Sequence, residues 1–156
     1  MRKLRVYADT SVFGGAFDEE FEEPTARFFE QVRLGRFELV SSGVVQAEME
    51  PAPEQVKNLF AETLPLAEIV DVTDEALALR NAYIEAGIVS GQWANDALHV
   101  ALATVSACAV IVSWNFKHIV HYRKIALYNG VNGSLGYAAL GIYSPREVIE
   151  YEDQDV

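Results

Sequence analysis

The sequence has one cysteine, no long apolar run and few basic residues, and each shortage excludes something. Cys108 is the only cysteine, so no disulfide can form within the chain. It stands in the apolar run 107–110, which predicts a small core residue. No apolar run is long enough to cross a bilayer, and the charged start at residues 2–5 lacks the apolar stretch of a secretion signal. We therefore expect a cytoplasmic protein without a membrane segment.

Positive charge is also scarce. The chain has 12 Lys and Arg against 23 Asp and Glu, which gives a formal net charge of -11. This balance argues against bulk electrostatic attraction to nucleic acid, which needs positive potential. It leaves room for a local basic patch, or for carboxylates neutralised by a divalent cation. With 156 residues, of which 51% are hydrophobic, the chain suits one globular domain over residues 1–156.

Short apolar strands alternate with helical segments along the chain. Strands are expected over 4–8, 37–40, 69–72, 110–113 and 142–143. Helices are expected over 24–34, 44–49, 55–63, 74–86 and 95–106, with a capped helix start at 144–147. Residues 13–17 and the Asn-Gly pairs at 129–130 and 132–133 predict turns. The alternation predicts an α/β fold with a parallel sheet and helices on both faces.

Four polar residues follow strands or begin helices. Asp9 ends the first strand, Glu48 lies in the helix after the second, Asp96 opens a helix, and Asn115 follows strand 110–113. Because ligands bind outside the carboxyl ends of parallel strands, we expect these side chains to gather at one edge of the sheet. Crowded carboxylates repel one another, so at least one pKa should rise. Oxygen ligands of this kind suit Mg²⁺ or Mn²⁺.

Each of these residues also has a plain structural interpretation. Asp9 and Asp96 could cap the helices that follow them, because helix starts favour negative charge. Glu48 could be a solvated helix residue, and Asn115 could be a turn residue. His99, one turn after Asp96, is expected to be a packed core residue rather than a metal ligand.

Residues 116–124 are the one basic segment with interleaved aromatic residues in this acidic chain. One interpretation is a phosphate-contacting patch beside the carboxylates. The other is an amphipathic helix with Ile119, Val120 and Tyr122 turned inward. Trp93 and Trp114 flank the predicted site in sequence, and either could stack on a base or simply pack.

Four segments match, in order, the motifs of PIN domains, and the sequence therefore resembles that family, which includes the VapC-type toxins of bacterial toxin–antitoxin pairs. The segments are Tyr7–Ser11, Val45–Glu48, Asn95–Ala101 and Val112–Phe116. The resemblance spans about residues 4–148. It implies a three-layer α/β/α fold with a mostly parallel central sheet, and cleavage of RNA that depends on Mg²⁺ or Mn²⁺.

By this resemblance, Asp9, Glu48 and Asp96 would bind the metal and, with Asn115, would form the catalytic set. Many members carry an acid where this chain has Asn115. An amide brings no charge, so Mg²⁺ should bind more weakly here than to four carboxylates. The residues expected to contact the substrate are Ser11, Lys117, His118, Arg123 and Lys124.

The resemblance also implies three partners: RNA, a cognate antitoxin protein and a second copy of the chain. Apolar helix residues that one small core need not hold favour the dimer: Phe28, Phe29, Leu59 and Phe60. Asn115 keeps a second function open, a PIN-like module that binds RNA or protein but cleaves poorly. A phosphatase of the haloacid dehalogenase type is disfavoured, because it needs an Asp two residues after Asp9, where this chain has Ser11.

Overall fold

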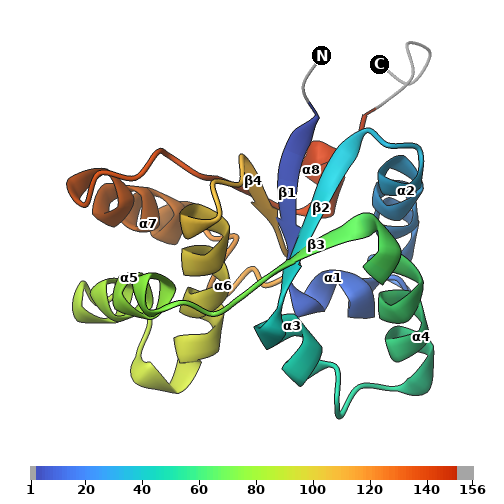
Figure 1. Cartoon of the computed structure of the whole chain (residues 1–156), viewed down its shortest axis with the longest axis horizontal. Coiled ribbons are helices and arrows are strands. Elements are labelled where there is room, and N and C mark those ends of the chain that lie inside the picture. Colours follow the sequence, from blue (N-terminus) through green and yellow to red (C-terminus); the bar gives the residue numbers. More distant parts are fainter. Residues whose placement is uncertain (1–2, 151–156) are drawn as a thin grey trace.

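A five-stranded sheet forms the middle layer of the computed structural model, which describes residues 3–150 (Figure 1). The strands run in the order β3-β2-β1-β4-β5, and all four pairings between them are parallel. Because β1 is central, its carboxyl end brings Asp9 to the middle of one sheet edge. The strands are β1 (Leu4–Ala8), β2 (Phe37–Ser42), β3 (Ala67–Val70), β4 (Val110–Val112) and β5 (Gly141–Tyr143).

Helices cover both faces of the sheet (Figure 1). One layer holds α1 (Thr10–Gly15), α2 (Glu22–Arg33), α4 (Glu54–Thr63) and α8 (Pro145–Val148). The other holds α5 (Asp74–Glu85), α6 (Ala94–Val105) and α7 (Tyr122–Ser134). The short helix α3 (Gly43–Glu48) continues directly from β2, and two 3-10 turns, η1 (Leu64–Leu66) and η2 (Gly91–Trp93), complete the elements described. The predicted three-layer α/β/α fold is confirmed.

One contiguous apolar core joins the sheet to both helical layers. Phe28, Phe29, Leu59 and Phe60 all belong to it, with at most 8% of each residue exposed. The ring of Phe13 contacts those of Phe29 and Phe60, each at 5.2 Å between centroids. The argument for a dimer from these four residues is therefore wrong, because α2 and α4 pack their apolar faces inward on one layer. Cys108 is buried in the core, as predicted.

The segment 13–17, predicted as a turn, lies mostly in α1, which ends at Gly15. The helix fits closely against Trp114, because a Cβ on Gly15 would lie 2.5 Å from the indole Nε1. Glycine at this position therefore permits a close approach between a helix and a core side chain rather than a change of chain direction.

The two Asn-Gly pairs, also predicted as turns, lie inside α7. Asn132 is fully buried, and its amide oxygen accepts a hydrogen bond from the Tyr83 hydroxyl at 2.5 Å. Asn129 accepts from the backbone N–H of Leu140 at 2.8 Å and donates to the Leu140 carbonyl at 2.9 Å. Tertiary hydrogen bonds thus hold both asparagines in a helix, against their local preference for turns.

The third strand was predicted over 69–72 and lies two residues earlier, at 67–70. Its neighbour β2 ends at Ser42, which pairs with Val70, so residues 71–72 have no strand to pair with. Among residues 3–150, no helix is both long and apolar enough to span a membrane.

Candidate active site

The carboxyl edge of the sheet holds a pocket of about 600 Å³. Three of the four residues predicted to form the catalytic set line it: Glu48, Asp96 and Asn115. The fourth, Asp9, directly follows β1 in the interior with 4% of the residue exposed, and it is not among the lining residues. The structure therefore brings the predicted residues to one edge of the sheet and separates them by depth.

Asp9 is held by two serine hydroxyls. Ser11 donates to its Oδ1 and Ser113 donates to its Oδ2, each at 2.6 Å. The same hydroxyls accept from the backbone N–H groups of Trp114 and Asn115, each at 2.9 Å. Asp9 is thereby tied to the loop that carries Asn115. Ser11 was predicted to contact the substrate, but its hydroxyl is engaged in this network instead.

The pKa of Asp9 is raised, chiefly because burial disfavours the charged form, and the charge of Glu48 adds to the rise. His99 and the two serine hydroxyls oppose it. A carboxyl pKa thus rises as the crowding argument predicted, but burial is the larger cause. Asp9 occupies the N-cap position of α1, yet its side chain makes no capping hydrogen bond.

Glu48, the last residue of α3, is fixed by two short hydrogen bonds to its Oε1. Thr10 Oγ1 donates at 2.6 Å, and His99 Nε2 lies at 2.6 Å. Burial acts to raise the pKa of Glu48, but the hydrogen bond and charge of His99, with the bond from Thr10, outweigh it and lower the pKa. The interpretation of Glu48 as a solvated helix residue is wrong, because 31% of its side chain is exposed and the carboxylate is held in place.

A buried chain of hydrogen bonds supports Glu48 from behind. Its carboxylate can only accept, so His99 Nε2 donates. In the neutral ring His99 Nδ1 then accepts from the Tyr7 hydroxyl, 2.8 Å away, and the Tyr7 oxygen accepts from Ser42 Oγ at 2.7 Å. His99 is 2% exposed, and Tyr7 and Ser42 are fully buried. Bonds aligned in this way polarise one another.

Sequence reasoning missed this chain of hydrogen bonds. It placed His99 correctly in the interior but did not connect the imidazole with Glu48. The one available signal was that His99 follows Asp96 by three residues, which puts both on the same face of α6. Nothing local pointed to Tyr7.

Asp96 is the third residue of α6 and is half-buried at the pocket wall. Asp96 lies in the first turn of α6, where a negative charge favours the helix start, as its structural interpretation expected, and the N-cap residue Trp93 makes no side-chain capping hydrogen bond. Asn115 lines the pocket too, and its Oδ1 accepts from the backbone N–H of His118 at 2.9 Å. Asn115 is therefore a turn residue and also part of the pocket wall.

The basic segment divides into residues at the pocket and residues away from it. Lys117 and His118 line the pocket, whereas Arg123 and Lys124 do not. Lys124 Nζ donates to the Ile88 carbonyl at 2.9 Å, and Arg123 lies exposed on the first turn of α7. Only half of the basic residues expected to contact the substrate thus stand beside the carboxylates.

The alternative interpretation of this segment as an inward-facing amphipathic helix is also wrong. Residues 116–119 form turns, and α7 begins only at Tyr122, which is 74% exposed. Ile119 is fully buried, as that interpretation required, and Val120 is half-buried.

The two tryptophans have different surroundings. Trp114 is 8% exposed, stacks on Phe21 at 4.1 Å and donates from Nε1 to Thr25 Oγ1 at 2.9 Å, so it packs. Trp93 is 38% exposed on the pocket wall. Its indole stacks on the His118 ring with centroids 4.6 Å apart.

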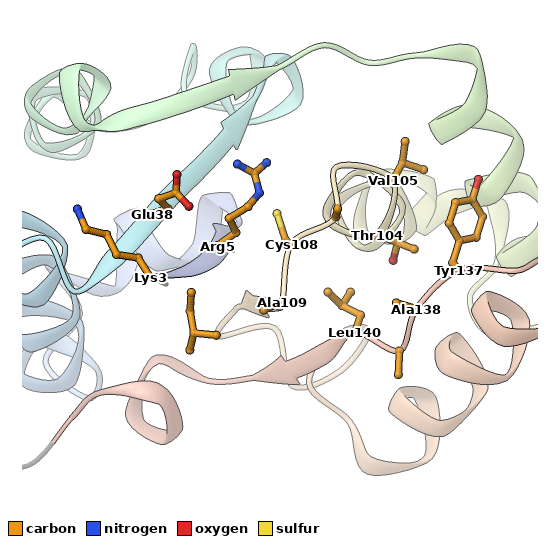
Figure 2. Close-up of a pocket in the computed structure, with 13 residues that line it drawn as sticks. Lys3, Arg5, Glu38, Thr104, Val105, Cys108, Ala109, Tyr137, Ala138 and Leu140 are labelled. Carbon is orange, nitrogen blue, oxygen red and sulfur yellow. The ribbon is translucent and has the colours of Figure 1, made fainter. Parts of the chain in front are cut away.

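A second cavity, of about 880 Å³, opens at the amino ends of β1, β2 and β4 (Figure 2). Arg5, Glu38 and Cys108 are among its lining residues. Arg5 is already paired with Glu68 at 3.1 Å, and burial raises the pKa of the Cys108 thiol to about 12, so the thiol is not a nucleophile at neutral pH. None of the residues predicted for the site lines this cavity.

Comparison with known proteins identifies the architecture. The sequence matches no protein-family model and no curated protein. Among solved structures, a chain of VapBC2 from Rickettsia felis, crystallised with a DNA fragment from its promoter, aligns with a TM-score of 0.54 at 19% identity. That alignment covers 73% of this chain and 90% of the other. FitAcB from Neisseria gonorrhoeae aligns with a TM-score of 0.57 at 13% identity, over 90% of this chain and 97% of the other.

The chain has a PIN-like fold. The pocket at the carboxyl edge is therefore the candidate active site of a PIN-like domain, because that edge of a parallel sheet is where ligands bind.

Proposed function

We propose that this PIN-like chain is a metal-dependent ribonuclease, and that Asp9, Glu48 and Asp96 hold Mg²⁺ or Mn²⁺ at the pocket. One observation carries the proposal. Two carboxylates, those of Glu48 and Asp96, line one pocket at the carboxyl edge of the sheet. The Ser113 hydroxyl links the buried Asp9 to the backbone of the pocket residue Asn115. The described residues offer Asp96 no hydrogen-bond or ion-pair partner, which leaves its charge available to a cation.

The donor set suits such a cation. Three carboxylates and the amide oxygen of Asn115 are hard oxygen donors of the kind that Mg²⁺ and Mn²⁺ select. As the side chains stand, residues 3–150 contain no three His, Cys, Asp or Glu close enough together to hold a metal ion. Binding by all three carboxylates therefore requires at least one of them to rotate toward the others.

The bound metal would orient the phosphodiester and promote attack by water. The chain's own residues do the rest. Thr10 and His99 hold Glu48 in one orientation, so little rotamer freedom is lost when a cation arrives. Lys117 stands at the same pocket and supplies the positive charge that positions a phosphate.

A matched pair of variants tests this proposal. Glu48 and Glu50 lie two residues apart, and Glu50 is exposed and absent from the pocket lining. Wild type should cut end-labelled RNA in Mn²⁺ and not in EDTA. Glu48→Gln should lose the cutting, whereas Glu50→Gln should keep it. Equal cleavage by the two variants would contradict the assignment.

The second candidate function is a PIN-like module that binds RNA or protein and cleaves poorly. The neutral Asn115 and the open arrangement of the carboxylates favour it. If wild type binds RNA without cutting it in Mn²⁺, and Asn115→Asp restores cutting, this function is the correct one. If wild type neither binds nor cuts RNA at low salt, both nucleic-acid functions fail.

We further propose that the chain is the toxin of a toxin–antitoxin pair, and that it forms a homodimer; the dimer now rests on the resemblance to PIN domains alone, because the four apolar helix residues lie in the core. Two structural neighbours support the proposal of a protein partner, namely VapBC2 and FitAcB. A small reading frame that overlaps this one upstream, whose product co-purifies with this chain, is the expected finding. Light scattering at micromolar concentration should give a mass of twice 17.3 kDa for the chain alone, and a monomeric mass would contradict the dimer.

A further inference from the structure

Part of the pocket lining is aromatic and basic rather than acidic. It consists of Trp93, Lys117 and His118, here called the aromatic wall. Lys117 Nζ lies 5.6 Å from the Trp93 ring centroid, and the His118 ring stacks on the same indole with 27° between the planes. These contacts hold the three side chains together as one surface. The carboxylates of Glu48 and Asp96 line the same pocket.

Trp93 leaves part of its indole accessible at the pocket. It is 38% exposed although it belongs to a pocket, whereas the other tryptophan of this chain is 8% exposed and fully engaged with Phe21 and Thr25. An aromatic face beside a cation is how proteins hold nucleobases in single strands, because every base presents a π face.

His118 adds a second, independent observation. It is 8% exposed, and neither ring nitrogen has a hydrogen-bond partner among the described residues. Buried polar atoms are paired in most native proteins, so two orphaned nitrogens on one pocket residue require an explanation. Both nitrogens are shielded from solvent, so the polar edge of a ligand beside Trp93 supplies a partner once the His118 ring turns toward the pocket.

We propose that the aromatic wall binds one nucleobase of a single-stranded RNA, stacked at Trp93, next to the carboxylates. The inference rests on the proposed ribonuclease function and adds a specific contact to it. The volume of about 600 Å³ accommodates a nucleotide. Within the aromatic wall, Trp93 then contacts the base and Lys117 contacts the phosphate.

Intrinsic fluorescence tests the stacking directly, because the chain has two tryptophans. In Trp114→Phe protein, Trp93 is the only tryptophan. Short single-stranded RNA in EDTA, which prevents metal-dependent cutting, should quench its emission. The same oligonucleotide with abasic sites should not. Trp93→Phe protein, in which buried Trp114 reports, should show no quenching with either RNA.

Affinity supplies the second measurement. Trp93→Leu should weaken binding of labelled RNA by about 5- to 150-fold and should bind abasic RNA no differently from wild type. Phe116→Leu is the matched control, because Phe116 is 47% exposed in the turn that carries Lys117 and His118 but does not line the pocket. It should bind as wild type does. Trp93→Phe keeps a ring and should retain most of the affinity if Trp93→Leu proves unstable.

The outcomes separate this inference from the function on which it rests. If wild type cuts RNA and Trp93→Leu binds it as tightly as wild type, the nucleobase site is overturned and the ribonuclease stands. If quenching occurs equally with abasic RNA, the wall binds backbone rather than base, and the inference is wrong. If wild type binds no RNA, both fall together.

Discussion

Replacing His99 by leucine removes both hydrogen bonds of a fully enclosed imidazole while leaving an apolar side chain of similar size. The variant deprives the Tyr7 hydroxyl of one of its two partners and deprives the Glu48 carboxylate of the bond from Nε2. Tyr7 is fully buried, so water cannot replace its lost partner. The Glu48 side chain is 31% exposed, so water can partly compensate there.

The expected loss of stability combines the effects at the Tyr7 hydroxyl and at the Glu48 carboxylate. An unsatisfied buried polar group costs about 1–3 kcal/mol. With the smaller loss at the half-exposed carboxylate, we expect His99→Leu to lower the free energy of unfolding by about 2–3 kcal/mol. For a chain of this length, that lowers the melting temperature by roughly 4–12 °C. Urea denaturation in EDTA measures the free energy, and circular dichroism measures the melting temperature.

Two further variants give the reasoning its sharpest test. Tyr7→Phe removes only the hydroxyl between Ser42 and His99, so its effect should not add to that of His99→Leu, and the double variant should show a coupling of about 0.5–3 kcal/mol. His99→Gln keeps a donor for Glu48 and should restore part of the stability. An unchanged melting temperature in His99→Leu, or strict additivity with Tyr7→Phe, would refute the linked chain of hydrogen bonds.

Three other predictions concern the carboxylates and the fit of α1. Asp9→Asn should raise the melting temperature of the metal-free protein, and the gain should be larger at neutral pH than in mild acid. The sign follows because a raised pKa in the folded state loses stability as pH rises through that pKa; a gain independent of pH would contradict it. Millimolar Mn²⁺ should raise the melting temperature of wild type by mass action and raise that of Asp96→Asn less, whereas no shift in wild type counts against the metal site. Gly15→Ala should cost about 1–3 kcal/mol in urea denaturation, because its Cβ would meet Trp114. Gly14→Ala, with no atom near the added Cβ, should not, and equal losses would refute the packing argument.

Much of this PIN-like fold could be predicted from the sequence because its signals are local. Buried parallel strands are short apolar runs, and the N-cap residues Thr73 and Ser144 predict the helices that follow them. The shared edge of Asp9, Glu48 and Asp96 also followed from local position, since the carboxyl ends of parallel strands must lie together. Their roles as metal ligands stay a prediction.

Other features depended on contacts between residues far apart in the chain. Local preference made the Asn-Gly pairs turns, yet Asn132 is held inside α7 by Tyr83, 49 residues away. Likewise, Glu48 is oriented by His99, 51 residues later, and His99 is oriented in turn by Tyr7 on the central strand. Hydropathy and periodicity report which residues are buried but not which buried polar groups meet. Only the packing of α6 against the sheet decided that these groups form one chain of hydrogen bonds.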